Sequence, residues 1–133
     1  MAHILLIDDE ELVRLTLREM LRGAGHTIAE AGDGRAAIAL FAATPPDLVI
    51  TDILMPEQEG LQTIAHMRTL RPRIKIIAMS GGGGPRSHDL FRYATLLGAR
   101  RALSKPFKKK DFLDAVEQVL AEPDEAPTSI PAA

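Results

Sequence analysis

The segment Asp47-Leu-Val-Ile-Thr-Asp-Ile-Leu-Met-Pro56 determines how the rest of this chain is interpreted. Its apolar run of Leu48, Val49 and Ile50 is short, rich in β-branched residues and enclosed by prolines, which favours a fully buried strand over a helix. Asp52 then stands at or just past the carboxyl end of that strand. Ligands of open α/β sheets bind at this edge, so Asp52 is a candidate for chemistry, with capping of a turn as the alternative.

The composition is that of an ordinary protein with one hydrophobic core. The chain has 133 residues, of which 46% are hydrophobic and 26% charged, with a net charge of -2 and no cysteine. The lack of cysteine excludes disulfides, thiolate nucleophiles and cysteine-based zinc sites. The small negative charge argues against direct nucleic-acid binding. No segment approaches the length of a membrane span or a secretory signal core, which predicts a cytoplasmic protein.

Apolar runs alternate with helical periodicities along the whole chain. Strands are predicted at residues 3–8, 27–31, 75–80 and 102–104, in addition to the central run that delivers Asp52. Helices are predicted with apolar positions from Val13 to Leu21, at residues 35–43, at residues 60–70, at about residues 88–97, and around Phe112, Val116, Val119 and Leu120. This alternation predicts a parallel sheet with helices on both faces and right-handed crossovers.

Details of these elements follow from local signals. Asp9 is a natural cap for the first helix, and the third helix is expected to direct Leu61, Ile64, Ala65 and Leu70 toward the core. Residues 81–87 read as a flexible glycine-rich loop. Prolines among small residues mark positions 122–133 as a disordered tail, so the folded domain is expected at residues 1–121.

Polar residues follow the first, third, fourth and fifth strands, at the point where each strand ends. They are Asp8, Asp9, Asp52, Ser80 and Lys105. Because the carboxyl ends of parallel strands share one edge of the sheet, these side chains are expected to gather there. Each of these four strand ends thus supplies a carboxylate, a hydroxyl or an amine, which are groups that take part in phosphoryl transfer.

The order and spacing of these residues, with Met55-Pro56, Gly60 and Pro106-Phe107, resemble the receiver domain of two-component response regulators. The resemblance covers about residues 2–120. Among receivers, the chain resembles those of the stand-alone chemotaxis type. It implies a flavodoxin-like (βα)5 doubly wound parallel sheet with strand order 2-1-3-4-5. It also implies a cis bond between Lys105 and Pro106.

The resemblance further implies a chemical role for each residue at the sheet edge. Asp52 would attack a phosphohistidine and become an aspartyl phosphate, in a phosphoacceptor that is not an enzyme in the usual sense. Mg²⁺ would be bound directly by Asp9 and Asp52, through water by Asp8, and by the backbone carbonyl of Leu54.

Two further residues would then contact the phosphoryl group. Lys105 would pair with one phosphoryl oxygen as a point charge. Ser80 would donate its hydroxyl to another oxygen and couple phosphorylation to movement of the loop after the fourth strand.

The chain departs from the receiver pattern at two places. Ala102 stands where receivers commonly carry a switch tyrosine or phenylalanine, so rotation of an aromatic side chain cannot report phosphorylation. The loop after the fourth strand is also longer than usual, and the excess is filled by Gly81, Gly82, Gly83 and Gly84. We expect this loop and the following helix, with Phe91 and Tyr93, to perform the switching.

Leu54 separates this chain from aspartate-nucleophile phosphatases, which would carry a second acid two positions after the nucleophile. Leucine there cannot orient an attacking water, which predicts slow hydrolysis of the phosphoryl group. The partners implied by the resemblance are a histidine kinase or histidine phosphotransfer protein upstream and a protein target downstream. That target would bind through the fourth helix, fifth strand and fifth helix, where Arg100, Arg101 and the lysines at positions 108–110 could contribute.

Other interpretations stay open at this point. One is a receiver-like interaction module that is never phosphorylated, although every site position is occupied by a suitable residue. Another is that the chain is the receiver portion of a longer regulator. Homodimerisation is also left open, because receivers dimerise through surfaces that one sequence does not reveal.

Overall fold

A computed structural model describes residues 1–53, 59–81 and 85–123 of the chain. Strands and helices alternate as the sequence predicted. The strands are β1 (His3–Ile7), β2 (Thr27–Ala31), β3 (Leu48–Asp52), β4 (Lys75–Gly81) and β5 (Arg101–Lys105). The helices are α1 (Glu11–Gly23), α2 (Gly34–Ala43), α3 (Glu59–Leu70), α4 (Pro85–Leu96) and α5 (Lys109–Ala121).

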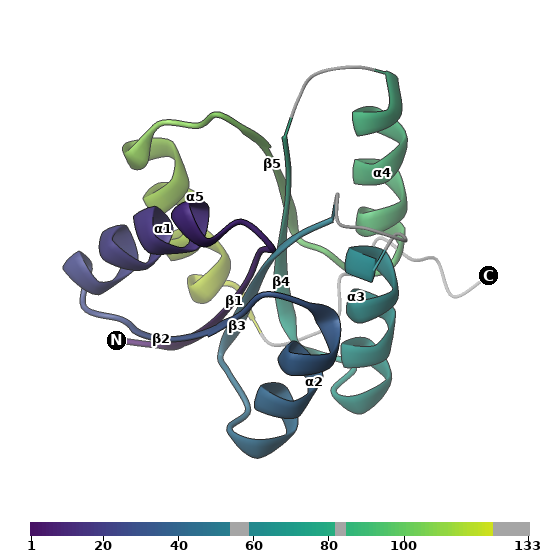
Figure 1. Cartoon of the computed structure of the whole chain (residues 1–133), viewed down its shortest axis with the longest axis horizontal. Coiled ribbons are helices and arrows are strands. Elements are labelled where there is room, and N and C mark those ends of the chain that lie inside the picture. Colours follow the sequence, from purple (N-terminus) through teal and green to yellow (C-terminus); the bar gives the residue numbers. More distant parts are fainter. Residues whose placement is uncertain (54–58, 82–84, 124–133) are drawn as a thin grey trace.

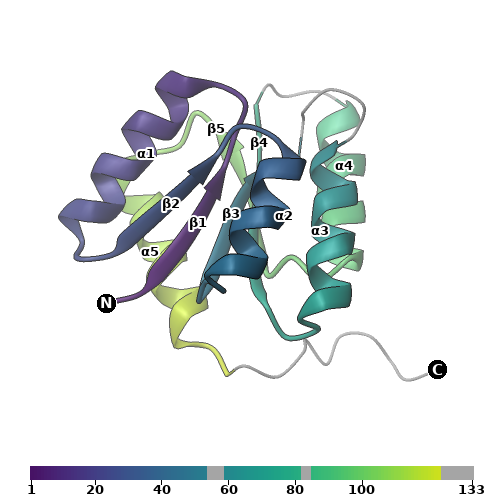
Figure 2. The same cartoon turned by 60° about the horizontal axis from the view of Figure 1, so that its bottom comes forward.

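The strands form one parallel sheet in the order β2-β1-β3-β4-β5, which confirms the flavodoxin-like prediction. The chain moves from β1 outward to β2 and then crosses to β3 on the other side of β1 (Figures 1 and 2). The connections after β1 and β3 therefore leave the sheet in opposite directions. A crevice at the carboxyl ends of these two strands is the usual binding position in such folds.

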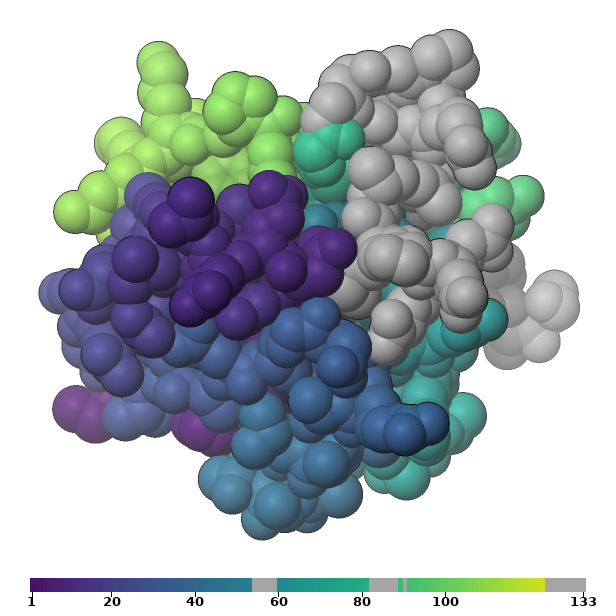
Figure 3. Space-filling model, viewed as in Figure 1, coloured from purple at the N-terminus to yellow at the C-terminus, as the bar shows by residue number. Residues whose placement is uncertain are grey.

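Helices cover both faces of the sheet, with α1 and α5 on one face and α2, α3 and α4 on the other (Figure 1). Successive residues of a strand point to opposite faces. Accordingly Leu5 and Ile7 of β1 belong to the core beneath α2, α3 and α4. Ile4 and Leu6 belong to the core beneath α1 and α5. The outer surfaces of α1 and α5, purple and yellow-green, lie side by side in Figure 3.

The central strands are apolar on both faces because both faces are covered. All residues of β3 are buried, and so is the run from Ile76 to Met79 in β4. These are the segments that lacked an alternating pattern in the sequence. The edge strands β2 and β5 keep mostly half-buried residues.

The structure corrects three predictions about local structure. Helix α4 begins at Pro85 instead of near residue 88, because proline is well suited to the first turn of a helix. Leu70 is 49% exposed, while Met67 lies in the core in its place. The residue preceding α1 is Glu10, not Asp9, and its side chain makes no capping hydrogen bond within the described ranges.

The chain beyond α5 begins with contacts to β5 and the residue before it. Glu122 pairs with Arg100 at 3.3 Å and with Arg101 at 2.6 Å, and the carbonyl of Pro123 accepts a hydrogen bond from Arg100. Residues 124–133 lie outside the described residues, so the predicted tail and domain boundary stay predictions. No helix in the described part of the chain has the length and apolar character needed to cross a membrane.

Candidate functional site

The carboxyl ends of β1, β3 and β5 deliver three of the predicted residues to one point. Asp8 follows β1 directly, whereas Asp52 and Lys105 are the last residues of β3 and β5. Strand β4 lies between β3 and β5, and its register sets Asp52 beside Met79 and Lys105 beside Gly81. Asp8, Asp52 and Lys105 therefore meet across the switch point of the sheet, as the sequence predicted.

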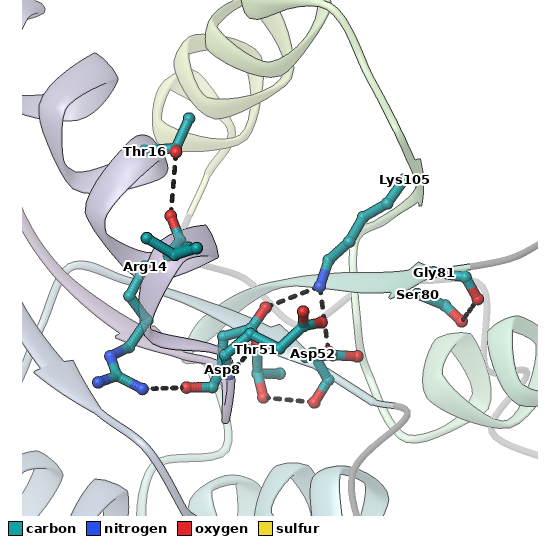
Figure 4. A network of polar contacts seen from close by, with 10 residues as sticks. Asp8, Arg14, Thr16, Thr51, Asp52, Ser80, Gly81 and Lys105 are labelled. Atoms are coloured by element: carbon teal, nitrogen blue, oxygen red, sulfur yellow. Dashed lines mark hydrogen bonds and ion pairs between the residues drawn. The ribbon is translucent and has the colours of Figure 1, made fainter.

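A single lysine bridges two buried carboxylates at this point (Figure 4). Lys105 Nζ lies 2.7 Å from Oδ2 of Asp8 and 3.1 Å from Oδ2 of Asp52. Asp8 is 0% and Asp52 3% exposed. Two carboxylates in such an environment repel each other, and the shared ammonium group offsets that repulsion.

The same contacts set the protonation of Lys105. Burial by itself lowers the pKa of the Lys105 ammonium group, but hydrogen bonds and charges from Asp8 and Asp52 together outweigh it. The net result is a pKa raised above the ordinary value of 10.5. Lys105 is thus held in its cationic form at neutral pH.

The site contains an acidic cluster, made of Asp8, Asp9, Glu10 and Asp52. Each of these residues has a carboxylate oxygen within 4.8 Å of the others. Asp9 and Glu10 are exposed, whereas Asp8 and Asp52 are buried. A set made of carboxylate oxygens suits a hard divalent cation such as Mg²⁺. The donor chemistry therefore fits a receiver-type magnesium site.

Glu10 is a member of this cluster that the sequence analysis did not assign to it. The backbone N–H of Glu10 donates to Oδ1 of Asp8 at 2.9 Å, which folds the turn after β1 back over the strand end. This turn carries Asp8, Asp9 and Glu10 toward β3. Their succession in the sequence was the available signal, but it is equally compatible with acids at a helix start.

Ser80 is placed at the same edge, near the end of β4, and is 1% exposed. Its hydroxyl makes a long contact of 3.4 Å with the carbonyl of Gly81 and points aside from the carboxylates in Figure 4. Gly81 is the last residue of β4. Leu54 and residues 82–84, which the sequence assigned to metal binding and to the loop, lie outside the described residues.

Two other expectations near the site can be compared with the structure. The peptide bond between Lys105 and Pro106 is cis, as the resemblance implied. Ala102 pairs with Ala78 in the β4–β5 register and is half-buried. Position 102 of β5 therefore carries a methyl group and not an aromatic ring.

Gly60 lies against the backbone that carries Asp52. A Cβ atom at position 60 would stand 2.5 Å from the carbonyl oxygen of Asp52 and 2.5 Å from Cα of Ile53. These neighbours are backbone atoms and cannot move aside without displacing the end of β3. The first turn of α3 therefore needs glycine where it passes Asp52.

A hollow lies at the opposite end of the sheet, away from the acidic cluster. It encloses about 840 Å³ and is bordered by residues that precede strands, including Ala2, Asp47 and Ile74. The site formed by Asp8, Asp52 and Lys105 is instead a charged rim at the strand ends. Its chemistry, not its volume, identifies it as the candidate site.

Fold and site together define an α/β domain of the receiver type, and comparison with known proteins agrees. The family model described as the response regulator receiver domain matches residues 4–117. The chain therefore belongs to the response-regulator receiver family of two-component signalling. Membership implies a histidine kinase as partner and places the chain among receivers, not among conventional enzymes.

Individual relatives include proteins of nearly the same length as this chain. The chain is 35% identical to Protein CcdB of Bacillus subtilis over 121 residues, covering 90% of this chain and 98% of that protein. It is 32% identical to the chemotaxis protein CheY of Thermotoga maritima over 118 residues, covering 88% and 96%. The solved receiver domain of NtrX from Brucella abortus has a TM-score of 0.84 at 27% identity, covering 90% and 99%.

Other matched regulators are longer than this chain. The match with this chain covers 55% of the length of one such regulator and 26% of the length of another. The activities of those longer proteins are therefore not transferred to this chain.

Proposed function

We propose that this chain is a phosphoacceptor that receives a phosphoryl group on Asp52 and passes the signal to a protein partner. The observation that carries the proposal is the bridge from Lys105 to the buried carboxylates of Asp8 and Asp52. A nucleophilic carboxylate, a second acid and a fixed cation within one strand-end crevice are the parts that phosphoryl transfer requires.

The proposed transfer forms one bond to phosphorus and breaks one. An oxygen of the Asp52 carboxylate attacks phosphorus of a phosphohistidine, and the phosphorus–nitrogen bond breaks. The electron pair of that bond stays on the imidazole nitrogen, which takes up a proton from solvent. The product is an acyl phosphate on Asp52 and a free histidine on the donor.

The acidic cluster fits Mg²⁺, for which Asp9 and Asp52 are the proposed direct ligands. Asp8 would act through water, and the carbonyl of Leu54 would add a further oxygen. The cation, when bound, neutralises charge on the transferring phosphoryl group. Because Leu54 lies outside the described residues, its part in the site stays a prediction, as does the slow hydrolysis inferred from it.

Lys105 and Ser80 are proposed to hold the transferred group. Lys105 already places its ammonium within hydrogen-bond distance of Asp52, so it can move to a phosphoryl oxygen while keeping its charge beside the site. Ser80 would exchange its long contact with the Gly81 carbonyl for a hydrogen bond to another phosphoryl oxygen. This exchange would alter the end of β4 and the loop at residues 81–84.

Output would follow from that change through α4, β5 and α5. Tyr93 and Leu96 of α4 are 58% and 68% exposed, which leaves apolar surface available to a partner. Arg100 and Arg101 contribute less to this surface than their sequence suggested, because both pair with Glu122. The phosphoryl donor is proposed to be a histidine kinase or a histidine phosphotransfer protein.

The test is the intact mass of the protein after incubation with Mg²⁺ and acetyl phosphate. Wild type should gain about one phosphoryl group, and the gain should disappear without Mg²⁺, after hydroxylamine, and in Asp52→Asn. Asp47→Asn is a matched control, because Asp47 lies just before β3 and its carboxylate binds the N–H of His3 instead. Equal gains in wild type and Asp52→Asn would overturn the proposal.

The same experiment addresses the alternative of a receiver-like module that is never phosphorylated. In that case wild type would gain no mass under any condition, including incubation with an active histidine kinase. The occupied site argues against this alternative, because two buried carboxylates would then be kept without a chemical use.

A further inference from the structure

Asp8 is held by partners on all of its polar groups. Its backbone N–H donates to the carbonyl of Ala31, its Oδ1 accepts from the N–H of Glu10, and its Oδ2 accepts from Lys105. The remaining group, the backbone carbonyl of Asp8, accepts a hydrogen bond of 2.6 Å from Nη1 of Arg14. This carbonyl belongs to the peptide unit that joins Asp8 to Asp9.

Arg14 reaches that carbonyl from the first turns of α1, as Figure 4 shows. The backbone N–H of Arg14 continues the helix by donating to Glu10, at 3.1 Å. On its other side the guanidinium pairs with Glu30 of β2, with 3.4 Å between Nε and Oε1. Arg14 therefore links the helix, the strand beside β1 and the acidic turn.

The space for the guanidinium is provided by the turn after β2. A Cβ atom at position 32 would lie 3.2 Å from Nη1 of Arg14, so Gly32 allows the side chain to pass close to the backbone. Glu30 and Gly32 thus bound the guanidinium on the β2 side. The Arg14 side chain is 19% exposed, which limits the number of other positions it can take.

We propose that Arg14 is a positioning residue for the metal site, acting on the peptide between Asp8 and Asp9. By fixing the orientation of this peptide, Arg14 sets the direction in which the Asp9 carboxylate leaves the turn, and holds it facing Asp52. Arg14 does not itself contact the cation or the phosphoryl group. This inference rests on the proposed magnesium site and adds to it a residue from outside the acidic cluster.

Positioning and simple electrostatics predict opposite results when Arg14 is replaced. Arg14 is a cation next to an acidic cluster, so removing its charge would by itself strengthen Mg²⁺ binding. Loss of a hydrogen-bond partner that orients metal ligands typically weakens binding by about 10-fold to about 100-fold. The sign of the change in Mg²⁺ affinity therefore separates the two explanations.

The experiment compares Mg²⁺ dissociation constants of wild type, Arg14→Met, Arg14→Lys and Arg18→Met by isothermal titration calorimetry. Arg18 is the matched control, because it lies one turn later on α1 and pairs with the same Glu30, at 2.5 Å. The contacts described for Arg18 do not include the acidic turn. Thermal unfolding followed by circular dichroism shows whether each variant is folded at the titration temperature.

We expect Arg14→Met to weaken Mg²⁺ binding by about 10-fold, and Arg18→Met to leave it unchanged within about twofold. Arg14→Lys keeps the charge but cannot serve both Asp8 and Glu30, so its affinity should lie between wild type and Arg14→Met. If Arg14→Met does not fold, weaker binding by Arg14→Lys gives the same support. Unchanged or tighter binding by the folded Arg14 variant, or equal weakening in Arg18→Met, would overturn the inference.

Failure of the proposed function would look different. In that case wild type itself would show no Mg²⁺ binding, which would overturn the magnesium site and the inference about Arg14 together. Wild-type binding with an Arg14 variant of equal affinity would leave the metal site intact and remove Arg14 from it.

Discussion

Nζ of Lys105 lies 2.7 Å from Oδ2 of Asp8, although 97 positions separate the two residues in the chain. Asp8 follows the first strand and Lys105 ends the fifth, so the contact requires the assembled strands from β1 through β3 and β4 to β5. The same ammonium group reaches Asp52 from β3. The proposed phosphoryl chemistry and the stability of the fold would therefore depend on one shared cation.

Lys105→Met should destabilise the fold in the absence of Mg²⁺. The substitution keeps most of the side-chain volume but leaves the buried carboxylates of Asp8 and Asp52 without their cation, at a cost of about 2 kcal/mol. Urea denaturation at neutral pH measures the loss. Lys110→Met is the control, because Lys110 is exposed and pairs with the exposed Asp114. Equal effects of the two substitutions would contradict the role given to Lys105.

The stabilisation from Lys105 should also depend on pH. The pKa of Lys105 is raised in the folded protein, so its contribution is fully present below the unfolded-state pKa of 10.5 and is lost as the pH rises through the folded-state pKa. Urea midpoints of wild type and Lys105→Met, measured from about pH 8 to about pH 12, should therefore converge at the alkaline end. A difference that stays constant over this range would contradict the ion pairs.

Gly60→Ala should both destabilise the protein and impair phosphorylation. The added Cβ would meet the backbone of Asp52 and Ile53 at 2.5 Å, which forces the end of β3 to shift, at a cost of about 2 kcal/mol. Urea denaturation and the mass gain with acetyl phosphate report the two effects. Gly23→Ala is the control, because a Cβ atom there meets nothing within 4 Å. Normal phosphorylation of Gly60→Ala would show that the contact does not position Asp52.

Phosphorylation should change amide hydrogen exchange in residues 81–97. Ala102 supplies no aromatic side chain, so the proposed report of phosphorylation runs from Ser80 through the glycine loop into α4. Exchange measured by mass spectrometry, with and without acetyl phosphate, should differ in peptides from this region and not in those from β2. Ser80→Ala should reduce the difference. Unchanged exchange across residues 81–97 in a phosphorylated sample would remove the loop from the switching mechanism.

The positions of the strands could be predicted because their signals are local, whereas the strand order was implied only by the resemblance to receivers. Buried parallel strands are continuous apolar runs, and the runs at Leu48 and Ile76 therefore had the correct positions. The start of α4 could not be placed in the same way. The glycines at positions 81–84 suggested a longer loop, whereas Pro85 already satisfies the needs of a first helical turn.

The part of the site that is formed by residues at strand ends could be predicted. Asp8, Asp52 and Lys105 follow from the rule that parallel strands end at one edge. Glu10 and Arg14 were missed for a common reason: both belong to the start of a helix, where charged residues are ordinary. Glu10 is turned toward the site by its own N–H bond to Asp8. The proposed role of Arg14 depends on its contacts with Glu30 and the Asp8 carbonyl, which no periodicity indicates.

Mapping the modified position shows directly whether Asp52 carries the phosphoryl group. Protein phosphorylated with Mg²⁺ and acetyl phosphate is reduced with borohydride, which converts an aspartyl phosphate into homoserine. Peptide mass spectrometry then locates the change. We expect homoserine at position 52 and unmodified Asp8, Asp9 and Asp47. Homoserine at another aspartate, with Asp52 unmodified, would contradict it.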